Sequence, residues 1–228
     1  MTRELLGRAP IDAGNNSGNE LRLFRRALKN GDEYSIMLGG IELMNSRLSG
    51  SEEALATLSC ARIATAHSRI LIGGYGMGFT LRAAQRALPE TAEIVVAELL
   101  PAIMEWAGGP MAQLTANCLD DPRVKIVLGD VKTNIATDQN HYDAILLDVD
   151  NGPDGLTKND NDHLYSNAGL HAAKLALRNG GILAIWSSAG DPAFTRRLQQ
   201  NGFAVEEHPI SARANGKGAR HMIWLARC

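Results

Sequence analysis

"ILIGGYGMGFT", residues 70–80, places four glycines within six positions, after an apolar run and before a predicted helix. A strand that ends in a glycine turn and continues into a helix presents backbone N–H groups and the positive end of a helix dipole. No side chain fills the space beside such a turn, so a nucleotide can approach the backbone closely. The stretch therefore predicts a nucleotide-binding loop in an α/β domain. The alternative is a tight turn that only allows close helix packing.

The spacing of the glycines narrows the choice of nucleotide. Gly74, Gly76 and Gly78 give G-x-G-x-G, whereas the dinucleotide fingerprint is G-x-G-x-x-G, and residue 79 is Phe. This difference disfavours NAD and FAD. A Walker A loop is excluded, because no Gly-Lys-Ser or Gly-Lys-Thr follows.

Apolar strands alternate with helical patterns from Arg69 onward, which is typical of βαβ units and a mostly parallel sheet. We expect strands near 70–73, 94–97, 124–128, 144–149 and 182–186, and helices near 79–88, 100–107, 111–117 and 163–178. A helix at Pro192–Gln200 follows. The last two strands, "FAVEEHPI" and "HMIWLAR", have no helix between them and should pair antiparallel at one edge of the sheet.

The chain before the glycine loop divides into two further parts. Residues 1–19 are polar and rich in Asn and Gly, which predicts a flexible segment. Residues 20–50 predict a β-hairpin, because they contain an Asn-Gly turn signal. The apolar face of this hairpin needs cover from the main domain or from a second chain. Residues 51–228 form the expected catalytic domain, which opens with a helix capped by Ser51.

Composition limits the class of partner. The chain has 228 residues, enough for one main domain, and its net charge of -2 gives no general attraction to nucleic acid or to an anionic membrane. No apolar run approaches the roughly 18 residues of a membrane span. Three widely spaced cysteines, Cys60, Cys118 and Cys228, fit a reducing, cytoplasmic compartment and argue against a thiolate metal site. We therefore expect a small-molecule partner and no bound metal.

Acidic residues stand at the ends of successive predicted strands. Glu98 lies 20 residues after Gly78 and is placed to accept both hydroxyls of a ribose, while Asp130 is placed to accept from an adenine amino group. Carboxyl ends of parallel strands meet at one edge of a sheet, so these residues should face one cleft. The alternatives are a solvated Glu98 and an ordinary Gly-Asp turn at Asp130.

The strand in "YDAILLDVDNGPDG", residues 142–155, brings two more carboxylates to the same edge. Asp148 and Asp150 lie on one side of an extended chain, and such a pair favours a cationic guest or a raised pKa that makes one of them a base. The alternative is that they only cap the following Asn-Gly-Pro turn. The polar loop after that turn has the length of a binding loop and runs to His163 and Tyr165.

From about Tyr34 to the C-terminus, the chain resembles the spermidine synthase-like branch of class I S-adenosylmethionine methyltransferases. The pieces that carry the resemblance are "YSIMLGGIELM", "ILIGGYGMGFTLRAA", "VVAEL", "LGD", "YDAILLDVDNGP" and "LYS". The resemblance implies a Rossmann-like, seven-stranded, mostly parallel sheet with an antiparallel last strand and helices on both faces. It also implies an adenosyl sulfonium donor and a homodimer.

The resemblance gives each candidate residue an expected role. Binding of the donor is expected from Gly74, Tyr75, Gly76, Gly78, Glu98 and Asp130. The reacting centre is expected at Asp148 and Asp150, with Tyr75, His163 and Tyr165 beside the acceptor.

Departures from the family pattern bear on the donor. The family usually places an Asp in the glycine loop to meet the free ammonium of decarboxylated S-adenosylmethionine, and here Tyr75 holds that place. The family's D-x-x-D-P-x-G-P segment is shortened to residues 148–153, and its Tyr-His-Glu is not evident where Glu52 and Glu53 stand. An Asp in the loop would repel the carboxylate of ordinary S-adenosylmethionine by on the order of 1–4 kcal/mol, and Tyr75 would not. These departures predict S-adenosylmethionine as the donor.

The first hypothesis is a methyltransferase acting on a small nucleophile, an amine or a ring nitrogen, with Asp148 orienting or deprotonating it and Asp150 steadying a positive acceptor. The alternative is aminopropyl transfer from decarboxylated S-adenosylmethionine to a diamine, with the same Asp148. A third hypothesis is a non-catalytic nucleotide-binding subunit. Modification of nucleic acid is disfavoured, because the last loop has three basic residues but no aromatic stacking platform.

Overall fold

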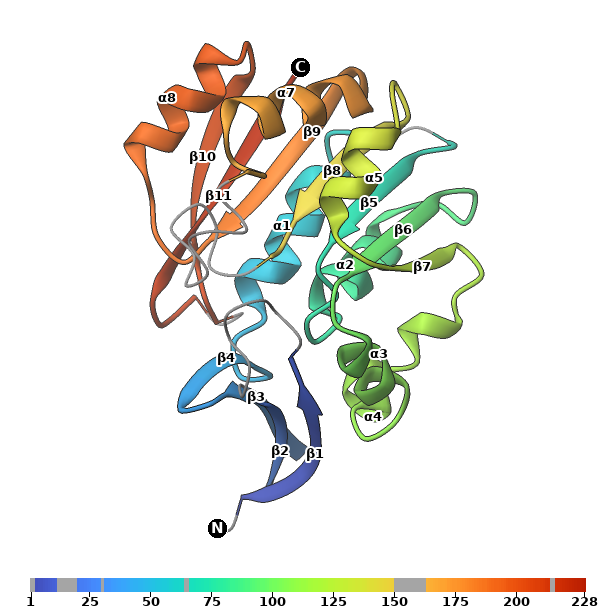
Figure 1. Cartoon of the computed structure of the whole chain (residues 1–228), viewed down its shortest axis with the longest axis vertical. Coiled ribbons are helices and arrows are strands. Elements are labelled where there is room, and N and C mark those ends of the chain that lie inside the picture. The colour runs from blue at the N-terminus through green and yellow to red at the C-terminus, as the bar shows by residue number, and fades with distance from the viewer. Residues whose placement is uncertain (1–2, 12–19, 30, 64–65, 150–162, 214–215) are drawn as a thin grey trace.

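The computed structural model describes residues 3–11, 20–29, 31–63, 66–149, 163–213 and 216–228, which form two sheets (Figure 1). The larger sheet has seven strands in the order β10-β11-β9-β8-β5-β6-β7, and the smaller sheet has four in the order β1-β2-β3-β4. No helix within these ranges is both long and apolar enough to cross a membrane.

The larger sheet confirms the predicted seven-stranded architecture. Its strands are β5 (Arg69–Gly73), β6 (Glu93–Glu98), β7 (Val124–Leu128), β8 (Tyr142–Leu147), β9 (Leu177–Ser187), β10 (Ala204–Ser211) and β11 (Arg220–Arg227). Strands β5 to β9 pair in parallel, whereas β11 pairs antiparallel with both β9 and β10. The last two strands pair as the sequence predicts, because a short loop joins them and a parallel crossover needs a longer connection.

Helices cover both faces of this sheet (Figure 1). One face carries α1 (Gly50–Cys60), α2 (Phe79–Ala87) and α3 (Pro101–Gly108), and the other carries α5 (Val131–Thr137), α7 (Asn167–Ala176) and α8 (Pro192–Gln200). Alternate strand residues supply the two cores: Ile70 and Ile72 face the first layer, and Leu71 faces the second. A sheet buried on both faces explains why its central strands are continuously apolar.

The strand order has its topological switch point at β5. Its neighbours β6 and β8 lie on opposite sides, so the connections that follow β5 and β8 diverge at their carboxyl ends. Ligands of open α/β sheets bind at such a point. The glycine loop and the predicted acidic residues all follow strands that end at this edge.

The smaller sheet is larger than the predicted hairpin. Strands β2 (Glu20–Leu28) and β3 (Gly31–Leu38) form that hairpin, and β1 (Glu4–Pro10) and β4 (Ile41–Asn45) pair antiparallel on either side. The flexible segment expected at residues 1–19 is therefore wrong for β1; residues 12–19 lie outside the described part. The alternating pattern of "ELLGRAP" was obscured by the Asn- and Gly-rich stretch that follows it.

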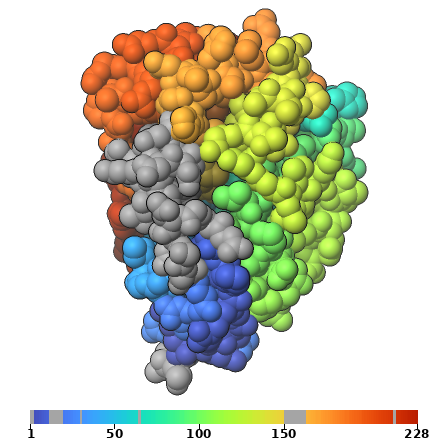
Figure 2. Space-filling view, in the orientation of Figure 1, coloured from blue at the N-terminus to red at the C-terminus, as the bar shows by residue number. Residues whose placement is uncertain are grey.

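The main domain covers the apolar face of the hairpin. Leu21, Leu23 and Ile36 are buried in the same core as Trp106 of α3. Gly7 of β1 lies so close to this ring that an added Cβ would be 2.5 Å from Trp106 Nε1. Figure 2 shows the N-terminal strands against the segment that holds α3 and α4 (Ala112–Thr115). A second chain is not needed for this cover, and the homodimer stays a prediction.

Candidate active site

The glycine loop packs closely on its neighbours. Gly74 has φ +86°, and an added Cβ would lie 2.4 Å from the backbone oxygen of Asp148. Gly78 has φ +75°, and its added Cβ would lie 2.9 Å from Tyr75 Oη. Gly76 also has a positive φ, but its nearest neighbour would be Met44 Sδ at 3.8 Å. Close packing thus requires Gly74 and Gly78, while Gly76 leaves the loop backbone uncrowded.

Glu98 ties this loop to the next helix. Its Oε2 accepts a hydrogen bond from the Tyr75 backbone N–H at 2.9 Å, and its Oε1 accepts from the Leu100 N–H at 2.9 Å. The side chain is only 6% exposed, and this burial raises the pKa of Glu98. The backbone N–H groups of Gly76 and Leu99 also stabilise the ionised carboxyl, and binding of a ribose by Glu98 stays a prediction.

The Tyr75 side chain belongs to the core. It is 2% exposed, and its hydroxyl lies 3.4 Å from Cys118 Sγ in the short 3-10 helix η2 (Cys118–Asp120). Burial raises the pKa of the phenol. The contribution of Tyr75 to the loop surface is therefore its backbone N–H, which Glu98 already binds.

Asp130 caps a helix. Its Oδ1 accepts from the Lys132 backbone N–H at 2.9 Å, and its Oδ2 lies 3.0 Å from Lys132 Nζ. This is the turn-type alternative that the sequence left open. Asp130 still follows β7 at the same sheet edge, and its role in binding adenine stays a prediction.

Asp148 forms an acid pair with Glu52, the second residue after the start of α1. Thr80 Oγ1 donates to Asp148 Oδ2 at 2.7 Å and lies 3.3 Å from the Glu52 backbone oxygen, so α1, α2 and β8 meet there. Burial raises the pKa of Asp148 to about 6. Burial, together with the charge of Asp148, raises the pKa of Glu52 to about 7. Two partly buried carboxyls that resist joint ionisation form a site suited to a cation.

A hydrogen-bonded chain continues from Glu52 to β11. Ser51 Oγ lies 2.7 Å from Glu52 Oε2 and 2.8 Å from His221 Nδ1. The predicted cap at Ser51 is wrong, because α1 begins one residue earlier and the Ser51 hydroxyl is used in this chain. The His221 ring packs edge-on against Trp186 of β9, with centroids 4.8 Å apart.

Of the three remaining predicted site residues, the structure describes His163 and Tyr165. Asp150 lies outside the described residues. His163 is exposed. Tyr165 is 2% exposed and packs edge-on against Phe194 at 5.7 Å, in the core on the opposite face of the sheet from α1. Substrate contacts by His163 and Tyr165 stay predictions.

Three neighbours of the acid pair, Ser51, Thr80 and His221, were not predicted from the sequence. Glu52 was noted only as an acid near the place of an absent motif. Its signal was ambiguous, since acidic residues are common in the first turn of a helix, where they favour the dipole. Only the packing of α1 over β8 and β11 brings these four residues together.

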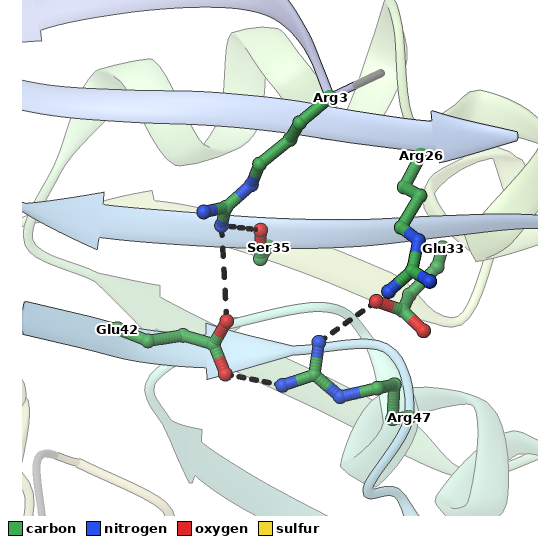
Figure 3. A pocket seen from close by; sticks show the side chains of 6 residues that line it. All are labelled: Arg3, Arg26, Glu33, Ser35, Glu42 and Arg47. Atoms are coloured by element: carbon green, nitrogen blue, oxygen red, sulfur yellow. Dashed lines mark hydrogen bonds and ion pairs between the residues drawn. The ribbon is translucent and has the colours of Figure 1, made fainter. Parts of the chain in front are cut away.

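A hollow of about 160 Å³ lies on the outer face of the small sheet, away from the acid pair (Figure 3). Its lining residues are Arg3, Arg26, Glu33, Ser35, Glu42 and Arg47. Arg47 pairs with Glu33 at 2.8 Å, and Arg3 lies 3.8 Å from Glu42. These charged side chains pair with one another near the surface.

Comparison with known proteins gives a family match. The family model described as spermine/spermidine synthase domain matches residues 50–202. A polyamine aminopropyltransferase of Mycobacterium tuberculosis is 32% identical over 156 residues, 64% of this chain and 28% of that protein. A putrescine N-methyltransferase of Nicotiana tabacum is 34% identical over 116 residues, 50% of this chain and 28% of that protein. The matches thus span less than a third of the length of these relatives.

Solved structures share the fold. The spermidine synthase from Thermotoga maritima superposes with a TM-score of 0.73 at 18% identity, covering 98% of this chain and 72% of that chain. A probable spermidine synthase from Corynebacterium glutamicum has a TM-score of 0.61 at 17% identity, covering 96% of this chain and 81% of that chain. At these identities the likeness concerns the fold alone.

The methyltransferase prediction is wrong. The matching family model is that of spermine and spermidine synthases, and relatives at 32% and 30% identity are polyamine aminopropyltransferases. The prediction depended on departures from the family pattern, chiefly the absence of an Asp at residue 75, where the structure buries the Tyr75 side chain against Cys118.

Proposed function

Because this chain belongs to the spermine/spermidine synthase domain family, we propose that it transfers an aminopropyl group from decarboxylated S-adenosylmethionine to a diamine or polyamine. The observation that carries the proposal is the pair of Asp148 and Glu52 at the carboxyl edge, beside the glycine loop. A diamine is a dication at neutral pH. Two carboxyls that share a partly buried site stabilise such a guest, and the guest in turn favours their ionised forms.

The reaction needs an amine that has lost a proton. The nitrogen lone pair attacks the aminopropyl carbon bonded to sulfur, the C–S bond breaks with its electrons going to sulfur, and the sulfonium becomes a neutral thioether. The acceptor arrives as an ammonium without a lone pair, so a carboxylate must take one proton. A raised pKa makes Asp148 and Glu52 better proton acceptors than ordinary carboxylates.

The two acids take different parts in this scheme. Asp148 adjoins the glycine loop, since its backbone oxygen is the atom that excludes a side chain at residue 74. We assign Asp148 to bind the acceptor nitrogen that attacks the donor. Glu52 would bind the same amino group. The loop N–H groups, Glu98 and Asp130 would hold the adenosyl part of the donor, with the sulfur toward Asp148.

The test is turnover with the decarboxylated donor. Purified protein is mixed with decarboxylated S-adenosylmethionine and putrescine, cadaverine or spermidine, and the polyamine product and methylthioadenosine are quantified by mass spectrometry. Asp148→Asn should lower kcat about 100-fold or more, the range of a lost general base, with an unchanged circular dichroism spectrum. The control is Asp120→Asn at an exposed aspartate of η2, which should keep wild-type kcat. Absence of aminopropylated product with every amine would refute the proposal.

A further inference from the structure

Hydrogen bonds through Ser51 connect Glu52 of the acid pair to His221 of β11. Ser51 is fully buried, with 0% exposure, whereas its two hydrogen-bond partners, Glu52 and His221, are partly exposed. The two hydrogen-bond distances, 2.7 Å to Glu52 Oε2 and 2.8 Å to His221 Nδ1, are short enough for proton transfer along the chain. Glu52 thus has a connection to the surface that does not pass through the space beside Asp148.

Ser51 has one hydroxyl proton, so hydrogen-bond donation among Glu52, Ser51 and His221 can run in either of two directions. When Glu52 is ionised, Ser51 donates to Glu52, so His221 must donate its Nδ1–H to Ser51 Oγ. When Glu52 carries a proton on Oε2, it donates to Ser51, and Ser51 donates to Nδ1 of His221. His221 then holds its own proton on Nε2. The tautomer of His221 therefore reports the protonation state of Glu52.

The groups packed around Glu52 and His221 separate the pH ranges in which these two side chains titrate. The charged groups that act on Glu52 within the described residues are Asp148, which follows β8, and Glu53 of α1, and Arg86 of α2 lies 3.8 Å from Glu53. Burial against Trp186 lowers the pKa of His221 below its usual value near 6.5. The imidazole is thus largely neutral at the pH where Glu52 titrates, and a neutral imidazole accepts protons.

We propose that Glu52, Ser51 and His221 form a proton relay that carries the proton of the acceptor ammonium to water. The inference rests on the proposed function, because that ammonium is the source of the proton. Glu52, which the proposed function places at the same ammonium as Asp148, takes one proton from that ammonium. It then passes a proton to Ser51 Oγ as the Ser51 proton moves to Nδ1, which gives an imidazolium. The imidazolium then releases its Nε2 proton to water. Glu52 is left as a carboxylate, with Ser51 donating to it and Nδ1–H donating to Ser51. Before the next transfer, opening of the Ser51–His221 hydrogen bond and exchange with water must return the imidazole to its Nε2–H tautomer, which frees Nδ1.

The first test observes the relay without turnover. Protein labelled with 15N-histidine is titrated from pH 6 to 8, and two-bond 1H–15N correlations report each tautomer; His221→Gln identifies the His221 signals. We expect His221 to change from the Nε2–H to the Nδ1–H tautomer with a midpoint near pH 7, the pKa of Glu52. Ser51→Ala and Glu52→Gln should each abolish this change. A His221 tautomer that is constant across this range in the wild-type protein would overturn the relay.

The second test is kinetic. Ser51→Ala and His221→Gln should lower kcat about tenfold or more, keep the amine KM within about twofold, and regain rate when imidazole is added as a replacement proton acceptor. Ser59→Ala is the matched control, because Ser59 is equally buried in α1 but bonds only the Leu55 backbone oxygen. Full kcat in Ser51→Ala, or a loss that imidazole does not restore, would contradict the relay. If the wild-type protein transfers no aminopropyl group, the proposed function fails, and the tautomer titration alone still decides the relay.

Discussion

At the scale of single residues, the acid pair is a source of instability as well as of chemistry. The pKa values of about 7 for Glu52 and about 6 for Asp148 lie above the range near 4 of free carboxyls. Between about pH 4 and 7, the folded protein therefore binds more protons than the unfolded chain. This contribution to stability is complete below about pH 4 and is lost as the pH rises through 7.

Glu52→Gln should remove this penalty. We expect the variant to exceed the wild-type free energy of unfolding by about 1–3 kcal/mol at pH 8, and by much less at pH 5. Urea denaturation at the two pH values measures the difference. Glu53→Gln is the control, because it removes a long ion pair with Arg86 at 3.8 Å and a charge that affects the pKa of Glu52 less than Asp148 does. If Glu52→Gln raised the free energy of unfolding equally at both pH values, ionisation of Glu52 would not be what destabilises the folded protein.

At the scale of elements, the glycine loop fulfils two demands that the sequence could not separate. Gly74 combines a positive φ with a backbone oxygen 2.4 Å from the position of an added Cβ, whereas Gly76 has only the positive φ. Gly74→Ala should lower the free energy of unfolding by about 3 kcal/mol or more, and Gly76→Ala by about 1 kcal/mol. Thermal and urea unfolding of the two variants provide the comparison. Equal losses of stability would mean that the backbone at Asp148 shifts to accommodate the added Cβ at residue 74.

The elements of the main domain were predictable because their signals are local. Apolar runs, the glycine turn and the short link between the last two strands each specify a strand, a loop or an antiparallel edge without knowledge of distant residues. The acid pair was not predictable in this way. Glu52 and Asp148 are separated by 96 positions, and only the layer of α1 over β8 brings them together. His221 joins them from a third element, which no spacing rule connects to Ser51.

At the scale of the whole molecule, the small sheet forms part of the environment of the site. Met44 of β4 is the nearest atom to the Cβ position of Gly76, and the chain runs directly from β4 into α1, which carries Ser51 and Glu52. Movement of this sheet would therefore displace both Met44, a neighbour of the glycine loop, and the start of α1, which carries Glu52. Its attachment depends on the close contact of Gly7 with Trp106.

Gly7→Ala should loosen that attachment. The added Cβ would stand 2.5 Å from Trp106 Nε1, and such overpacking typically costs about 1–3 kcal/mol, so the ring or the strand must move. Native-state hydrogen exchange should then show faster exchange for amides of β1 and β2, while amides of β5 and β8 keep wild-type protection. Gly40→Ala is the control, because an added Cβ there meets nothing within 4 Å. Equally faster exchange in β5 would indicate that the small sheet and the main domain unfold as one unit. The contact between Gly7 and Trp106 would then not control the small sheet separately.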